Sequence, residues 1–170
     1  KGSTFRVILP TRKGTVAKEV QVEGTPKEGE EFLVADEADQ IFYEELLSGK
    51  NILIVDDDSR NIFTLSSVVQ ELGADTYSAL NGEDAYKLLE EEDAKMDVIL
   101  MDIMMPIMDG LEAITKIKED ERFKHIPIIA VTAKTMKEDK KMCYEAGAND
   151  YLPKPIDQNA LISMLKAWSK

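Results

Sequence analysis

Short polar motifs directly follow four apolar segments of this sequence and supply carboxylate, hydroxyl and ammonium groups. Asp56-Asp57-Asp58 and Asp102 provide the carboxylates, Thr132 a hydroxyl and Lys154 an ammonium. Clustered carboxylates repel one another and need a cation, and an all-oxygen ligand set without His or Cys favours Mg²⁺ or Mn²⁺. A carboxylate nucleophile, a metal ion, an ammonium and a hydroxyl together can carry out phosphoryl transfer.

Each motif taken alone also has a structural explanation. The three aspartates can form a turn and a helix cap, Thr132 can cap a helix, and Lys154 can lie in a surface loop between two prolines. Asp102 is harder to explain structurally, because an unpaired charge among apolar residues is costly. The joint occurrence of these groups at four strand ends is what favours a chemical site.

Residues 50–170 alternate apolar segments with amphipathic ones, which predicts five strand–helix units. Such alternation indicates an α/β fold with a parallel sheet and helices on both faces, because each crossover is right-handed. Five units suit the flavodoxin-like strand order 2-1-3-4-5, in which ligands bind at the carboxyl ends of the strands. Strands are expected at 51–55, 75–78, 96–101, 127–131 and 151–152, and helices at 59–72, 82–92, 111–119, 136–146 and 158–168. Ser59 and Asp157 are the expected caps of the first and last helices.

The first 49 residues differ from the rest in composition and hydrophobic pattern. Residues 4–10 alternate and end at a proline, which predicts a strand. Residues 11–49 carry ten acidic and four basic residues, a composition typical of a linker, with a possible helix at 35–47. Because the chain starts without Met, we expect it to be a piece of a longer protein.

Composition excludes several classes of function. The net charge of −12 argues against a nucleic-acid partner, which would need a basic face. No apolar stretch is long enough to span a bilayer and no signal peptide is visible, so we expect a cytoplasmic segment without membrane contact. The single cysteine, Cys143, cannot form an internal disulfide and is expected to be a buried thiol. The single histidine, His125, is expected in the loop before the fourth strand.

Four motifs together resemble the receiver domain of two-component signalling over about 120 residues. Residues 52–58 resemble its first strand and acidic cluster, and residues 101–110, with Met-Pro and Asp-Gly, resemble its phosphorylation loop. Residues 127–133 and 151–155 resemble its fourth-strand and fifth-strand motifs. The resemblance implies a domain at 50–170 that takes a phosphoryl group from a phosphohistidine of a kinase or phosphotransfer domain.

The resemblance also implies roles for single residues. Asp102 corresponds to the phosphoacceptor, while Thr132 and Lys154 correspond to the phosphate contacts. Asp57, Asp102 and the backbone carbonyl of Met104 correspond to metal ligands, and Asp56 would act through a metal-bound water. Tyr151 corresponds to the aromatic residue that follows the threonine when the site is phosphorylated. Asp58 falls outside the usual acidic pair.

Residues 1–10 resemble the last strand of a histidine-kinase ATPase domain, which suggests the receiver of a hybrid histidine kinase. Two alternatives remain open. A stand-alone response regulator would signal only by protein contact. A haloacid-dehalogenase-like phosphohydrolase would also use an aspartate nucleophile, but its Asp-x-Asp pair is absent, because Ile103 and Met104 follow Asp102.

Overall fold

The computed structural model describes residues 46–91, 95–133 and 136–169. The expected strand at 4–10, the acidic linker and most of the possible helix at 35–47 lie outside these residues. Strands and helices alternate along the described chain, as predicted. In order they are β1 (Asn51–Val55), α2 (Ser59–Glu71), β2 (Asp75–Ala79), α3 (Gly82–Glu91), β3 (Val98–Asp102), α4 (Gly110–Glu119), β4 (Ile128–Thr132), α5 (Lys137–Ala146), β5 (Asp150–Pro153) and α6 (Gln158–Trp168). No described helix is both long and apolar enough to cross a bilayer.

The five strands form one parallel sheet in the order β2-β1-β3-β4-β5, which confirms the predicted flavodoxin-like topology. All four strand pairs are parallel, so the carboxyl ends of the strands lie along one edge. The register pairs Val55 with Met101 and Asp102 with Val131. The residues that follow β1 and β3 are therefore neighbours at this edge.

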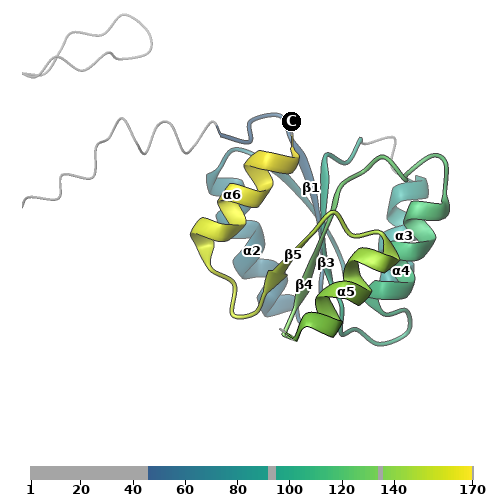
Figure 1. Cartoon of the computed structure of the whole chain (residues 1–170). Coiled ribbons are helices and arrows are strands. Elements are labelled where there is room, and N and C mark those ends of the chain that lie inside the picture. Colours follow the sequence, from purple (N-terminus) through teal and green to yellow (C-terminus); the bar gives the residue numbers. More distant parts are fainter. Residues whose placement is uncertain (1–45, 92–94, 134–135, 170) are drawn as a thin grey trace, which may run out of the picture. The chain divides into compact units, whose positions relative to one another are not determined.

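Two apolar layers hold the sheet, one on each face. Helices α3, α4 and α5 cover one face, and α2 and α6 cover the other (Figure 1). Alternate residues of β1 point to opposite layers: Leu53 and Val55 pack on the α3–α5 side, and Ile52 and Ile54 on the α2–α6 side. Burial on both faces explains why β1, β3 and β4 are almost wholly apolar.

The segment before β1 also contributes to the core. Leu47 is 1% exposed and packs in the layer between the sheet and helices α2 and α6. Its N–H donates to the carbonyl of Leu72, at the end of α2, over 2.8 Å. The packed unit therefore begins before residue 50, and Leu46–Gly49 forms a turn.

Aspartates cap three of the helices. Asp58 rather than Ser59 caps α2, because its carboxylate accepts from the N–H of Arg60, so the expected cap was one residue off. Asp109 and Asp157 accept from N–H groups in the first turns of α4 and α6. Gly147 ends α5 at a φ of 107°, a left-handed conformation that favours glycine.

Gly110 allows the start of α4 to lie directly against the end of β3. Its N–H donates to the carbonyl of Ile103 over 3.1 Å. A Cβ at this position would overlap the backbone oxygen of Asp102 and lie 2.7 Å from the Cα of Ile103. The neighbouring atoms are backbone and cannot swing aside, so only glycine fits.

We predict that Gly110→Ala destabilises the domain by about 2–3 kcal/mol, because the added methyl displaces the backbone of β3. Urea unfolding followed by circular dichroism measures the change. Thr115→Ala, on the exposed face of the same helix, is the control and should stay within about 0.5 kcal/mol of the parent. Equal stability of Gly110→Ala and the control would contradict the close approach.

Candidate functional site

Three aspartates meet at the carboxyl edge of the sheet, between β1 and β3. Oxygen atoms of Asp56, Asp57 and Asp102 all lie within 4.8 Å of one another. Asp56 and Asp102 are 2% and 4% exposed, whereas Asp57 is exposed. Parallel pairing of β1 with β3 places these sequence-distant groups side by side, as the sequence predicted.

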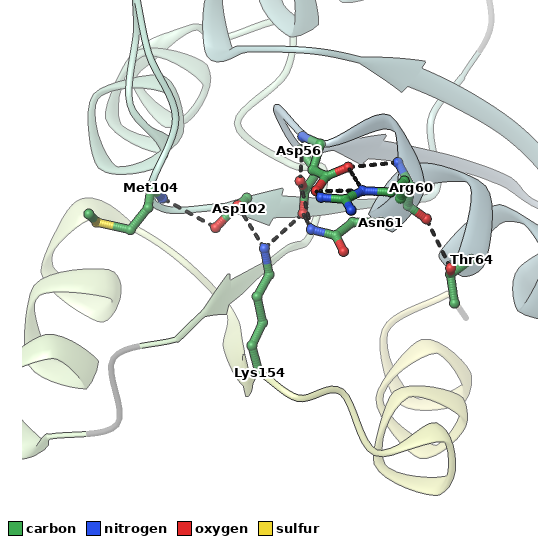
Figure 2. Close-up of polar contacts among 8 residues, drawn as sticks. Asp56, Arg60, Asn61, Thr64, Asp102, Met104 and Lys154 are labelled. Atoms are coloured by element: carbon green, nitrogen blue, oxygen red, sulfur yellow. Dashed lines mark hydrogen bonds and ion pairs between the residues drawn. The ribbon is translucent and has the colours of Figure 1, made fainter.

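Lys154 bridges the two buried carboxylates. Its ammonium lies 2.8 Å from Oδ2 of Asp56 and 2.7 Å from Oδ2 of Asp102, as Figure 2 shows. Burial lowers the pKa of the Lys154 ammonium, but its hydrogen bonds to Asp102 and Asp56 raise it more, so the pKa lies above its ordinary value. Lys154 therefore stays charged at neutral pH and offsets part of the carboxylate repulsion.

The run of three aspartates divides into three different environments. Asp56 is enclosed by donors, Asp57 faces solvent, and Asp58 turns away to cap α2. Arg60 holds Asp58 through contacts of 3.0 Å from Nε and 2.6 Å from a terminal nitrogen. These hydrogen bonds lower the pKa of Asp58 to about 2. Asp58 is thus engaged in local structure, which leaves Asp57 as the exposed carboxylate of the cluster.

Asp102 keeps one oxygen on the lysine side and one on the loop side. Oδ2 accepts from Lys154, and Oδ1 accepts from the backbone N–H of Met104 over 3.2 Å. The Met104 side chain is exposed and extends away from Lys154 (Figure 2). The loop after β3 therefore orients the Asp102 carboxylate through its backbone.

Thr132 and Tyr151 lie on the neighbouring strands β4 and β5. Thr132 is buried at the end of β4, and its carbonyl accepts from the backbone N–H of Lys154 over 2.8 Å. Tyr151 is half-buried, and the ammonium of Lys140 lies 4.3 Å from the centre of its ring. Thr132 thus lies on the strand next to β3, and Tyr151 lies one strand further along the sheet.

A cavity of about 460 Å³ opens beside the acidic cluster, between the loop after β3 and helix α5. Asp57 and Thr132 line it, and the other sides combine apolar side chains of the loop and the helix with Asp109 and Asp139. Cys143 also lines the cavity and is buried, and burial raises the pKa of its thiol. This confirms the expected buried thiol. His125 is exposed in a turn before β4, as expected.

The donor set fits a hard divalent cation. All three cluster ligands are carboxylate oxygens, and Lys154 neutralises only part of their charge. Oxygen ligands of this kind suit Mg²⁺ or Mn²⁺ rather than zinc, which prefers nitrogen and sulfur.

Two residues of the site escaped the sequence analysis. Asn61 donates to both oxygens of Asp56, over 3.0 and 3.1 Å, and Arg60 holds Asp58. Asn61 lies in the first turn of α2, where Asn is a poor helix former, and this was the one available signal.

The receiver-domain family model, described as the response regulator receiver domain, matches residues 52–166. The chain is 39% identical over 128 residues to hybrid signal transduction histidine kinase L of Dictyostelium discoideum, covering 73% of the chain but only 7% of that protein. It is 38% identical over 116 residues to protein PilH of Pseudomonas aeruginosa, covering 68% of the chain and 94% of that protein.

A solved structure is similar as well. It is the receiver domain of a sensor histidine kinase from Pseudomonas aeruginosa PAO1, with a magnesium ion coordinated in its active site cleft. The TM-score is 0.66 at 34% identity, over 72% of this chain and 98% of that one.

We predict that Lys154→Met destabilises the domain by about 3 kcal/mol in chelator, because two buried carboxylates lose a shared cation. Urea unfolding measures the loss. Lys87→Met makes the same substitution in an exposed pair with Glu83 and should cost less than about 0.5 kcal/mol. Similar losses in both variants would show that Lys154 does not offset the buried charge.

Proposed function

This chain belongs to the response regulator receiver domain family of two-component signalling, and from this premise we propose that Asp102 accepts a phosphoryl group from a phosphohistidine. The observation that carries the proposal is the contact of Lys154 with both buried carboxylates, beside an exposed third one. In this arrangement the Asp102 carboxylate is the nucleophile for phosphoryl transfer, and the Lys154 ammonium 2.7 Å away is its charge partner.

The transfer is an in-line displacement at phosphorus. A carboxylate oxygen of Asp102 forms a bond to phosphorus while the bond from phosphorus to the histidine nitrogen breaks, and the released imidazole keeps the electron pair. The product is an acyl phosphate. Lys154 neutralises charge on the transferring group, and the Thr132 hydroxyl donates to one of its oxygens. The cavity beside Asp57 and Thr132 gives the donor an approach.

The proposed metal ion is Mg²⁺, for which Mn²⁺ can substitute. Asp57, Asp102 and the backbone carbonyl of Met104 would hold it, and Asp56 would contribute through a water. When bound, such an ion neutralises the carboxylates and the phosphoryl oxygens. This ligand set is supported by the clustering of the carboxylate oxygens within 4.8 Å.

The proposed response to phosphorylation involves Thr132 and Tyr151. The new dianion on Asp102 attracts the Thr132 hydroxyl, and the Tyr151 ring follows into the space beside it. A conformer that already exists gains population because the phosphoryl group interacts with it more favourably. Strand β5 and helices α5 and α6 would present the change to other proteins.

The partner is a histidine kinase or phosphotransfer domain, and we propose that the parent chain is a hybrid histidine kinase. The similarity to a Dictyostelium hybrid kinase and to the receiver of a Pseudomonas sensor kinase supports this. The similarity to PilH over nearly its whole length supports the alternative, a stand-alone regulator that acts by protein contact. The proposed boundaries are a kinase-domain strand at 1–10, a linker at 11–49 and the receiver at 50–170. Sequencing upstream of Lys1 in the gene distinguishes the two.

We predict that Asp102→Asn abolishes labelling by acetyl phosphate with Mg²⁺, because an amide is no nucleophile at neutral pH. Mass spectrometry of the intact protein measures the added phosphoryl group. Asp75→Asn is the matched control, since Asp75 is exposed at the start of β2, on the opposite edge of the sheet, and it should label like the parent. Stoichiometric acyl phosphate on Asp102→Asn would overturn the assignment.

We also predict that the acyl phosphate decays slowly, which suits relay to a second histidine. Met104 follows the acceptor by two residues and has only a weak acceptor sulfur, so it cannot hold a water in line with phosphorus. Lys134, two residues after Thr132, is long enough to cover the phosphate or to pair with its charge, and it lies outside the described residues.

Met104→Asn or Met104→Glu should speed decay several-fold, about 1 kcal/mol of barrier, because these side chains can hold a water. The measurement is the loss of phosphoprotein over time after the donor is removed. Ile107→Asn, at another exposed position of the same loop, is the control. If the acyl phosphate of the parent decays within seconds, or if it decays equally fast in the parent and the Met104 variants, Met104 does not set the rate of decay.

A further inference from the structure

We infer that Asn61 is a positioning residue of the phosphoacceptor site, which holds the Asp56 carboxylate on Lys154 and away from the metal ion. The inference rests on the proposed function for the role of the metal and of Lys154. Among the described residues, the Asn61 side chain donates hydrogen bonds to Asp56 and not to Asp102, so it acts through Asp56.

Both oxygens of Asp56 accept hydrogen bonds. Oδ1 accepts from the N–H of Asp58 over 2.9 Å and from the Asn61 amide over 3.0 Å. Oδ2 accepts from Lys154 over 2.8 Å and from the same amide over 3.1 Å. A carboxylate offers about four acceptor sites, so these contacts use most of its acceptor capacity. Asp56 is therefore a fixed anchor for Lys154 rather than a spare metal ligand.

The backbone of Asn61 is also held in place. The backbone N–H of Asn61 donates to the carbonyl of Asp58 over 2.9 Å, and Asp58 caps the same helix. The side chain points from the first turn of α2 back to the end of β1 (Figure 2). Asn disfavours helix interiors because its side chain competes for backbone groups. The contact with Asp56 gives a reason for its presence here.

Charge explains why a neutral donor is needed. A second cation in this position would cancel a further negative charge of the cluster and compete with a divalent ion. An apolar residue would remove one hydrogen-bond donor from each oxygen of the buried Asp56 carboxylate. An amide satisfies Asp56 without adding charge. The site keeps its negative field for the metal ion, while Asp56 keeps its orientation.

Removal of the amide should therefore have two opposite effects. The Asp56 oxygens would lose their neutral donor, and because they lie within 4.8 Å of ligand oxygens of Asp57 and Asp102, they could turn to the cation. Binding of the cation would become tighter. Lys154 would lose its fixed anchor, and transfer to Asp102 would become slower. A merely structural role predicts instead that both properties weaken together.

The test uses Asn61→Leu, which keeps the side-chain size and removes the donor. Titration calorimetry with Mg²⁺ should give a Kd lower by roughly threefold to tenfold, the size expected for one hydrogen bond of ordinary strength. The initial rate of labelling by acetyl phosphate at saturating Mg²⁺ should fall by about tenfold. Asn61→Ser is the second variant, in case the leucine variant does not fold.

Two controls make the result specific. Thr64→Val changes the next turn of α2, where the hydroxyl bonds only the carbonyl of Arg60, and should leave both values unchanged. Asp57→Ala should weaken Mg²⁺ binding and shows that the titration reports the acidic cluster. An unchanged or higher Kd, or an unchanged rate, in the Asn61 variants overturns the inference. Failure of the parent to label on Asp102 overturns the proposed function instead, and the Mg²⁺ titration still tests Asn61.

Discussion

The contact of one ammonium with two buried carboxylates is the constraint on which the rest of the site depends. Asp56 follows β1, Asp102 ends β3 and Lys154 follows β5, so the contact exists only if three strands end at the same level. The strand between Lys154 and Asp102 is β4, and its last residue, Thr132, accepts the backbone N–H of Lys154. The lysine thus reaches across a strand end that also holds its backbone in place.

Apolar packing on both faces of the sheet sets the level at which the strands end. A slip of one residue in β1 would move Leu53 and Val55 to the layer built for Ile52 and Ile54, because side chains alternate between the faces. The same slip would carry Asp56 out of reach of Lys154. The core therefore fixes the positions of the site residues through register, and Gly110 completes the arrangement by letting α4 start against the end of β3.

Sequence patterns predicted the strands, the helices and the strand order, because the periodicity of buried faces is local and repeated five times. The strand-end residues followed from topology alone. The different environments of Asp56, Asp57 and Asp58 could not be predicted from the sequence, because three identical side chains differ only in the residues that surround them. Asn61 and Arg60 decide those surroundings, and Leu47 joins a core whose other members lie far along the chain. Such contacts exist only after folding.

A domain selected for stability alone would not keep this site. Buried ion pairs can often be replaced by apolar residues without loss of stability, because the cost of desolvating the two charges offsets their attraction. Among the described residues, the Lys154 ammonium contacts two of the three clustered carboxylates, so the pairing is incomplete. The remaining negative charge disfavours the empty fold and favours a divalent ion, while the neutral Asn61 amide orients Asp56 without cancelling that charge. The incomplete pairing is thus the property that makes the site ready to bind a cation and a phosphoryl group together.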